Sequence, residues 1–265
     1  MKKGHIWGII FILAGLGGGY FLAALNDNGS RRISVPADFR NEDISRVKNN
    51  LQTVEMGMGG QAPLESAPDK LVEFDVPFVV QAPTANWDDP VFQNACEEAS
   101  IIMAMGWVRG TKSISSADAQ KQILDLDGFE MRTFGYSYDT DVSDVKRIFE
   151  EYYHHPGVSV REDIAAPDII KELQAGNLVL VPAFGQALGN PNYTYPGPVV
   201  HMLVVRGYDP DRREFITNDP GTKRGAGYRY GEKILLDAIW RYPSGQGVPP
   251  VPVGNFKKAM VVVAK

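Results

Sequence analysis

The hydrophobic positions after residue 72 change period several times along the chain, and each period predicts one kind of element. Apolar residues three and four apart indicate helices, and β-rich runs between turn residues indicate strands. The predicted helices cover residues 96–110, 116–126, 140–153, 166–176 and 234–242, and the predicted strands cover residues 72–83, 177–184, 197–209, 213–221 and 259–265. In the first helix, Ala99, Ile102 and Met103 mark the predicted buried face. Because helices come first and antiparallel strands later, we expect an α+β domain over residues 73–265.

Residues 1–25 combine two early lysines with an uncharged apolar stretch at residues 6–25. As a helix, this stretch is long enough to cross the hydrocarbon core of a bilayer. We therefore expect an N-terminal membrane anchor with the rest of the chain outside the cytoplasm. The alternative is a cleaved signal peptide and a secreted protein, because the small residues Ala23 and Ala24 stand near its end.

Residues 26–72 have the composition of a linker, with Gly, Pro and small polar residues at both ends. Apolar residues at helical spacing allow one short helix at residues 43–54, and disorder fits the same residues equally well. Gly15 and Gly19 are spaced as a close contact between two membrane helices requires, so we also consider weak dimerisation there.

The composition of the chain limits the kinds of partner and ligand that we expect it to bind. The 265 residues carry a formal net charge of −5, and no block of basic residues is interleaved with aromatic ones. We therefore expect no binding of nucleic acid. Cys96 is the single cysteine, which excludes an intrachain disulfide and a thiolate-rich metal site.

Cys96 stands where a reactive thiol would be favoured. The thiolate is the form that attacks a carbonyl carbon, and the positive end of a helix favours that anion. Cys96 lies at the start of a predicted helix, so it is our candidate nucleophile. The alternative is a small buried side chain that only packs.

Four histidines are candidates for the general base. His5 lies beside the apolar N-terminal stretch, and His154 and His155 lie at a predicted helix end, where they would stabilise its C-terminus. His201 begins a β-run and remains as the candidate partner of the cysteine. A hydrogen-bonded structural histidine in a strand is the alternative.

A carboxylate should orient the imidazole by accepting its second N–H. The strands on either side of residues 209–212 have the pattern of a hairpin, in which we expect Val205 to pair with Phe215. His201 then lies opposite Asp219, and opposed residues project to the same face of a sheet. Asp219 also begins an Asp-Pro-Gly turn signal, which is compatible with this role.

Acyl transfer also needs donors for the developing oxyanion. The backbone N–H of Cys96 is one candidate, and the side chain of Gln81, at the end of the strand before the cysteine loop, is the other. Gln93 is closer in sequence, but a place in the loop explains it equally well.

At these residues the chain resembles the C-thirty-nine-like peptidases, a papain-like family related to the bacteriocin double-glycine leader peptidases. The matching stretches are DVPFVVQAP, NWDDPVFQNACEEAS, HMLVVRGYD and FITNDPG, which together cover most of residues 74–221. The resemblance implies a helical part packed on an antiparallel sheet and hydrolysis of peptide bonds in a polypeptide through a thioester, without a cofactor or metal. It implies Gln81 as oxyanion donor, Cys96 as nucleophile, His201 as base and Asp219 as its orienting partner.

The chain departs from the family directly after the cysteine. Glu97 and Glu98 stand where members often carry Gly-Pro. Such charges oppose ionisation of the thiol, weakly if both face solvent and more strongly if they do not. A carboxylate that points into the cleft would instead be placed to bind a cationic group of the substrate.

Two other functions fit the same residues. One is a peptidoglycan amidase or endopeptidase of the NlpC type, and the other is a papain-like domain retained for binding without catalysis. In either case, loop aromatics such as Trp87, Tyr193 and Tyr195 are candidates to line a substrate groove or to cap the core.

Overall fold

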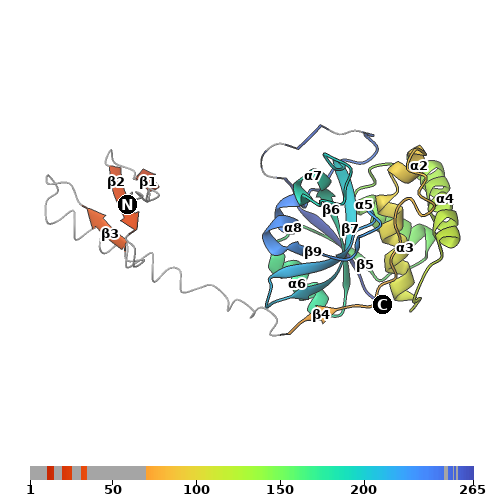
Figure 1. The fold of residues 1–265 in the computed structure, drawn as a ribbon, viewed down its shortest axis with the longest axis horizontal. Coiled ribbons are helices and arrows are strands. Elements are labelled where there is room, and N and C mark those ends of the chain that lie inside the picture. The colour runs from red at the N-terminus through yellow and green to blue at the C-terminus, as the bar shows by residue number, and fades with distance from the viewer. Residues whose placement is uncertain are drawn as a thin grey trace, which may run out of the picture. The chain divides into compact units, whose positions relative to one another are not determined.

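Figure 1 shows the fold of the chain in a computed structural model. The structure describes residues 11–14, 20–25, 31–34, 70–247, 250–252, 254 and 256–265. By its internal contacts the chain divides into two units, Met1–Leu64 and Glu65–Lys265.

The N-terminal unit contains a small antiparallel sheet in the order β1-β2-β3. Its strands are β1 (Phe11–Ala14), β2 (Tyr20–Leu25) and β3 (Arg31–Ser34). The expected membrane helix over residues 6–25 is not seen, because its described parts are strands and the rest lies outside the described residues. Aromatic and β-branched residues suit strands as well as helices, and the glycines between these strands disfavour a continuous helix.

Two further expectations concern the same end of the chain. Within the described residues, no helix combines the length and the apolar character that crossing a bilayer requires. The short helix expected at residues 43–54 lies outside the described residues.

The second unit is built on a seven-stranded antiparallel sheet, in which the strand order is β5-β10-β6-β7-β8-β9 and β4 pairs with β7. The strands are β4 (Val72–Glu73), β5 (Val158–Glu162), β6 (Leu178–Phe184), β7 (Val200–Asp209), β8 (Glu214–Asn218), β9 (Ala226–Gly231) and β10 (Ala259–Val263). The helices are α2 (Pro90–Gln93), α3 (Cys96–Val108), α4 (Ser116–Thr133), α5 (Val142–Arg147), α6 (Ala166–Gln174), α7 (Gly185–Leu188) and α8 (Glu232–Ala238). A π-helical turn, Ile148–Tyr152, continues α5.

Helices cover both faces of this sheet (Figure 1). Side chains of α3, α4 and α5 share one hydrophobic core with Met202 and Val204 of β7. Side chains of α6, α7 and α8 share a second core with Leu203 and Val205. Successive residues of β7 enter different cores because side chains of a strand alternate between its two faces. The α+β prediction is confirmed.

Helix α3 is buried around its whole circumference. Every side chain from Cys96 to Trp107 is buried, so the predicted buried face at Ala99, Ile102 and Met103 was too narrow. Gly110, in a left-handed conformation with φ of +70°, lies just beyond its end, as the sequence predicts. Glu97 and Glu98 are buried with the rest, so neither carboxyl group faces solvent.

The hairpin of β7 and β8 forms, but not in the predicted register. Val205 pairs with Thr217, two residues beyond the predicted partner Phe215, and a bulge at Arg206 separates this pair from the next. A slip of one residue would move Asp219 to the other face, whereas a slip of two preserves the face. Asp219 therefore remains on the side of His201.

The first predicted strand, residues 72–83, is much shorter than expected. Only Val72 and Glu73 pair with β7. Pro77 has no N–H to donate to a neighbouring strand, and the chain beyond it runs without regular structure to the cysteine loop. The short elements α2, α7, β5 and β9 were not predicted, because none carries a run of apolar residues long enough to show a period.

Candidate active site

Gln81 connects the two loops that carry the candidate catalytic residues. Its backbone N–H donates to the carbonyl of Pro220, next to Asp219, at 3.0 Å. Its side-chain Nε2 donates to the carbonyls of Phe92 and Gln93, at 3.1 and 2.9 Å, just before α3 begins. Both hydrogens of the amide are thus engaged, so the predicted oxyanion role would require Gln81 to release one of these carbonyls.

Cys96 lies at the first position of α3, as the sequence predicts. The preceding residue Ala95 offers no side-chain cap, so the helix start depends on the contacts of Gln81 and α2 rather than on a capping oxygen. At this position the Cys96 N–H has no acceptor within its own helix, which suits it to donate to an oxyanion.

The Cys96 thiol forms a hydrogen bond with the side chain of Glu97. Its Sγ donates to Glu97 Oε2 at 2.9 Å, and the Tyr242 hydroxyl donates to Glu97 Oε1 at 2.6 Å. All three side chains are buried. Burial, followed by the charge of Glu97, raises the pKa of Cys96 well above its ordinary value, although a backbone hydrogen bond with Met202 acts in the opposite direction. The thiol is therefore held in its protonated form.

His201 and Asp219 form a buried hydrogen bond, with 2.9 Å between Nε2 and Oδ1. His201 lies in β7, and Asp219 follows the end of β8. Since Asp219 is an acceptor, this bond assigns the proton to Nε2 and leaves Nδ1 as the basic nitrogen. The predicted pairing of the two side chains is therefore present despite the shifted register.

Four other groups hold the Asp219 carboxylate. Tyr193 and Tyr230 each donate a hydroxyl to Oδ2 at 2.6 Å, Asn190 donates to Oδ2 at 3.2 Å, and the Gly221 N–H donates to Oδ1 at 3.0 Å. Burial alone would raise the pKa of Asp219, but the charge and hydrogen bond of His201 and the two tyrosines outweigh it and lower the pKa to about 2. Asp219 is therefore ionised at every physiological pH.

No hydrogen bond joins Cys96 Sγ to the imidazole of His201 among the residues that the structure describes. The two residues nevertheless meet through one peptide unit. Ser100, one turn beyond Cys96 on α3, donates to the carbonyl of Met202 at 3.3 Å, and Cys96 itself has a hydrogen bond with the Met202 backbone. The thiol thus lies beside Met202, the residue that follows His201, and it donates its hydrogen bond to Glu97.

Two hollows lie along the loop between α7 and β7. One, of about 460 Å³, is lined by Gln81, Trp87, Gln93, Tyr193, Thr194, Pro198 and Gly221. Neither Cys96 nor His201 lines it, but Gly221 does, and a methyl group placed on Gly221 would come within 3.0 Å of His201 Cε1, so the hollow lies next to the buried imidazole. We refer to it as the catalytic cleft.

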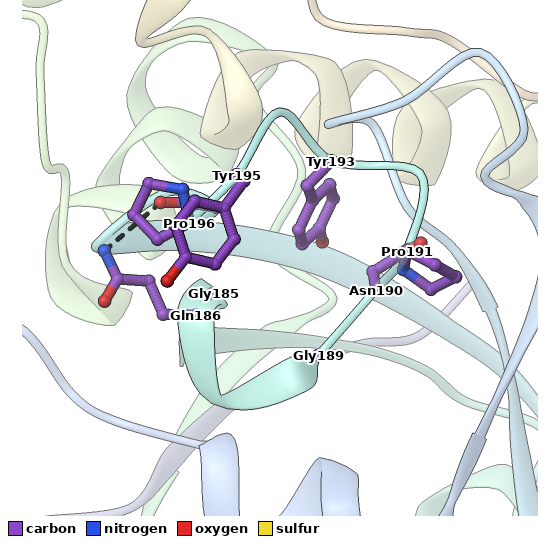
Figure 2. Close-up of a pocket in the computed structure, with 9 residues that line it drawn as sticks. Gly185, Gln186, Gly189, Asn190, Pro191, Tyr193, Tyr195 and Pro196 are labelled. Carbon is purple, nitrogen blue, oxygen red and sulfur yellow. Dashed lines mark hydrogen bonds between the residues drawn. The ribbon is translucent and has the colours of Figure 1, made fainter.

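The second hollow, of about 340 Å³, lies on the other side of Tyr193 and is shown in Figure 2. There Gln186 of α7 donates to the carbonyl of Gly197, and Tyr195 lies beside Pro196 at the rim. Tyr195 is almost fully exposed, whereas Tyr193 lines the catalytic cleft and bonds Asp219. Of the loop aromatics singled out from the sequence, Trp87 and Tyr193 therefore line the catalytic cleft.

Sequence reasoning missed the burial of a group of acids next to the thiol. Glu130 of α4 is fully buried beside the equally buried Glu98, and the hydrogen bond available to its carboxyl group is one with that second carboxyl, which requires a proton between them. Its charge raises the pKa of Glu98 after the larger effect of burial. A signal was available, because Glu130 continues the apolar stripe of Ala119, Ile123 and Leu126 at helical spacing.

These acids are not arranged as a metal centre. Within the part of the chain that the structure describes, no group of three or more His, Cys, Asp or Glu side chains is placed to hold a metal ion.

Fold and site together define a class of protein. It is an α+β domain in which a helix begins with a cysteine beside an antiparallel sheet that carries a buried histidine–aspartate pair. The family model of the Peptidase_C39 like family matches residues 73–248, and the chain belongs to that family. The resemblance found from the sequence motifs is thereby confirmed.

Other comparisons add little to this assignment. A crystal structure of a candidate C39-like peptidase from Bacillus anthracis is 15% identical, with a TM-score of 0.48, and covers 74% of this chain and 99% of its own. No curated protein matches the chain.

Proposed function

We propose that this chain is a cysteine peptidase that hydrolyses peptide bonds in a polypeptide, with Cys96 as nucleophile, His201 as general base and Asp219 as the group that orients the base. The observation that supports it best is the buried His201–Asp219 hydrogen bond, at 2.9 Å, beside the start of the cysteine helix. Membership of a peptidase family supports the reaction class.

The reaction begins when the thiol leaves Glu97 and gives its proton to Nδ1 of His201. The thiolate attacks the carbonyl carbon, and the resulting oxyanion is stabilised by the Cys96 N–H and by Gln81 once its amide releases a carbonyl. The imidazolium then protonates the leaving amine, which leaves a thioester on Cys96. Water, deprotonated by His201, hydrolyses the thioester and restores the thiol.

Asp219 supports both proton transfers without being protonated itself. Its carboxylate fixes the Nε2–H tautomer, which keeps Nδ1 free, and it stabilises the imidazolium by charge. Tyr193, Tyr230 and Asn190 hold that carboxylate in place.

The test is an unbiased cleavage profile. The wild-type chain and its Cys96→Ala variant are incubated with a proteome-derived peptide mixture and, separately, with purified cell-wall fragments, and new termini are identified by mass spectrometry. We expect peptide cleavage that Cys96→Ala reduces by about 10³-fold or more. Cleavage confined to cell-wall fragments would favour an amidase instead.

A ranked series of variants tests the assigned roles. His201→Ala should lose nearly as much activity as Cys96→Ala, because the proposed mechanism needs the imidazole both to take the thiol proton and to protonate the leaving amine. Asp219→Asn should lose less, since Tyr193 and Tyr230 can accept from the new amide nitrogen and leave its oxygen for His201. Steady-state kcat/KM on one cleaved peptide gives the ranking, and far-UV circular dichroism checks each fold.

A second candidate is a binding domain without catalysis. One observation favours it: the Cys96 thiol donates its hydrogen bond to Glu97 and not to His201. This candidate would be supported if the wild type and Cys96→Ala showed the same negligible turnover on every substrate.

A further inference from the structure

The catalytic cleft continues into a third hollow of about 410 Å³. The two share Trp87, Thr194 and Gly221, so they adjoin one another beside the segment that follows Asp219. The floor and sides of this extension are otherwise neutral, but its far rim carries Lys223 and Arg224.

Both cations at this rim are exposed and lack an ion pair among the residues that the structure describes. Arg224 has only the neutral Asn192 as a side-chain partner, with 3.4 Å between Nη1 and Oδ1. Elsewhere on this acidic protein, arginines beside the sheet are paired with carboxylates, as Arg206, Arg213, Arg229 and Arg241 show. Lys223 and Arg224 therefore differ from these four arginines in having no carboxylate partner among the described residues.

The nearest acids do not neutralise the rim. Asp219 is buried, and His201, Asn190 and the two tyrosines already occupy its oxygens. Asp88 is exposed and follows Trp87 in the chain, but it does not line the hollow.

The loop that carries the two cations is tied to the catalytic aspartate. The Asp219 N–H donates to the carbonyl of Gly225 at 3.0 Å, and Thr222 Oγ1 accepts the N–H of Arg224 at 3.2 Å. A side chain on Gly225 would collide with the Asp219 carbonyl, so the two segments are in close contact. The backbone that carries Lys223 and Arg224 is thus held close to Asp219, the hydrogen-bond partner of His201.

We propose that this extension of the cleft is a specificity subsite for an acidic side chain, aspartate or glutamate, of the polypeptide substrate. This inference rests on the proposed peptidase function and names the substrate class of the same site. The carboxylate would lie between Lys223 and Arg224, with its methylene groups against Trp87. Because both cations are exposed, two such ion pairs should favour acidic peptides by about tenfold in kcat/KM, and salt should weaken the preference.

Matched peptides test the subsite. From one cleaved sequence, a set is made in which each position near the scissile bond carries Glu, Gln or Lys, and kcat/KM is measured at low and high ionic strength. Wild type should prefer Glu over Gln at one position by about tenfold, and Lys223→Glu and Arg224→Glu should each reduce or invert that ratio. Arg132→Glu, an equal charge change on α4 outside the three hollows, is the control and should keep the wild-type ratio.

The outcomes separate the two proposals. Cleavage that depends on Cys96 but shows no Glu preference, or a preference that all three charge variants change equally, overturns the subsite and leaves the peptidase intact. Failure of the wild type to cleave any peptide overturns both.

Discussion

Two groups near Cys96 can accept the thiol proton, and they favour different chemistry. Glu97 accepts it in the structure, and Tyr242 holds Glu97 in place. His201 Nδ1 is the acceptor that the proposed hydrolysis needs, so Sγ must give up its hydrogen bond to Glu97 before the proton can go to the imidazole. Since burial and the charge of Glu97 raise the pKa of Cys96, the resting thiol should react slowly with small reagents.

Replacing Glu97 tests this competition. Glu97→Gln removes the negative charge beside the sulfur, so the pKa of Cys96 should fall and the thiolate should become more populated. We expect alkylation of Cys96 by iodoacetamide at pH 7 to accelerate about tenfold, with the midpoint of its pH profile moved to lower pH. Peptide mapping by mass spectrometry locates the label.

Glu98→Gln is the matched control, because Glu98 is equally buried but makes no hydrogen bond to the sulfur. Its effect should be smaller than that of Glu97→Gln. Equal acceleration in both variants would show that general charge in the helix start, rather than the Cys96–Glu97 contact, restrains the thiol.

The sequence alone indicates candidate residues for this site better than it indicates their contacts. Cys96, His201 and Asp219 became candidates because each belongs to a scarce type or to a turn with a clear pattern. The Cys96–Glu97 bond was not predictable, because neighbouring residues of a first helical turn can place their side chains in several directions.

At the scale of elements, the interface of α3 and α4 buries acids in an apolar environment. Burial raises the pKa values of Glu97, Glu98 and Glu130 above their ordinary values. The folded state therefore holds these protons more tightly than the unfolded state. This proton binding stabilises the folded protein, and the effect is fully present below the ordinary glutamate pKa. It is lost as pH rises through the raised values.

Glu130→Gln should therefore stabilise the protein at pH 8. Removing a carboxylate that is buried among other acids should raise the free energy of unfolding by about 1–3 kcal/mol, and the gain should vanish near pH 4.5. Urea denaturation of wild type and variant at both pH values measures it.

Glu172→Gln provides the contrast, because Glu172 of α6 is also buried but is paired with Arg161. Glu172→Gln should lower the free energy of unfolding at pH 8, because it removes the charge that pairs with Arg161. A Glu130→Gln variant that is no more stable than wild type at pH 8 would contradict the account of the α3–α4 interface.

Element patterns were informative wherever an apolar run is long. Helix α6 follows a run with one apolar face, whereas α3 and the strands β6, β7 and β10 follow nearly continuous apolar runs that are buried on more than one face. The hairpin register was wrong by two, because the turn and the bulge at Arg206 depend on local backbone geometry that side-chain alternation does not report. The alternation of side chains along a strand determines which face of the sheet each residue occupies, so a shift of two residues leaves Asp219 on the same face as His201.

At the scale of the whole molecule, segments far apart in the chain converge on Asp219. The loop after α7 supplies Asn190 and Tyr193, and β9 supplies Tyr230. These partners lie outside the four motifs that carried the family resemblance, so the resemblance could not indicate them. Tyr230 comes close to Asp219 because the sheet places β9 next to β8.

The N-terminal residues 6–25 support a further prediction, which rests on the sequence. Although residues 11–14 and 20–25 are strands in the structure, the length and apolar character of this stretch suit a membrane-spanning helix, and we propose that in a bilayer it anchors the full chain with the second unit outside the cytoplasm. Cell fractionation should recover the full chain with membranes after a carbonate wash, and a chain that begins at Glu65 should be recovered in the soluble fraction. A released protein whose N-terminus has been cut near Ala24 would show a signal peptide instead.

The most direct test of the catalytic claim is the rate at which a peptide electrophile labels Cys96. A vinyl sulfone built on a cleaved sequence requires both substrate binding and transfer of the thiol proton to His201. Intact-protein mass spectrometry should show one adduct, located at Cys96, that forms in wild type and is slowed about 10²-fold or more in His201→Ala. Equal labelling rates in wild type and His201→Ala would contradict the assignment of His201 as the base.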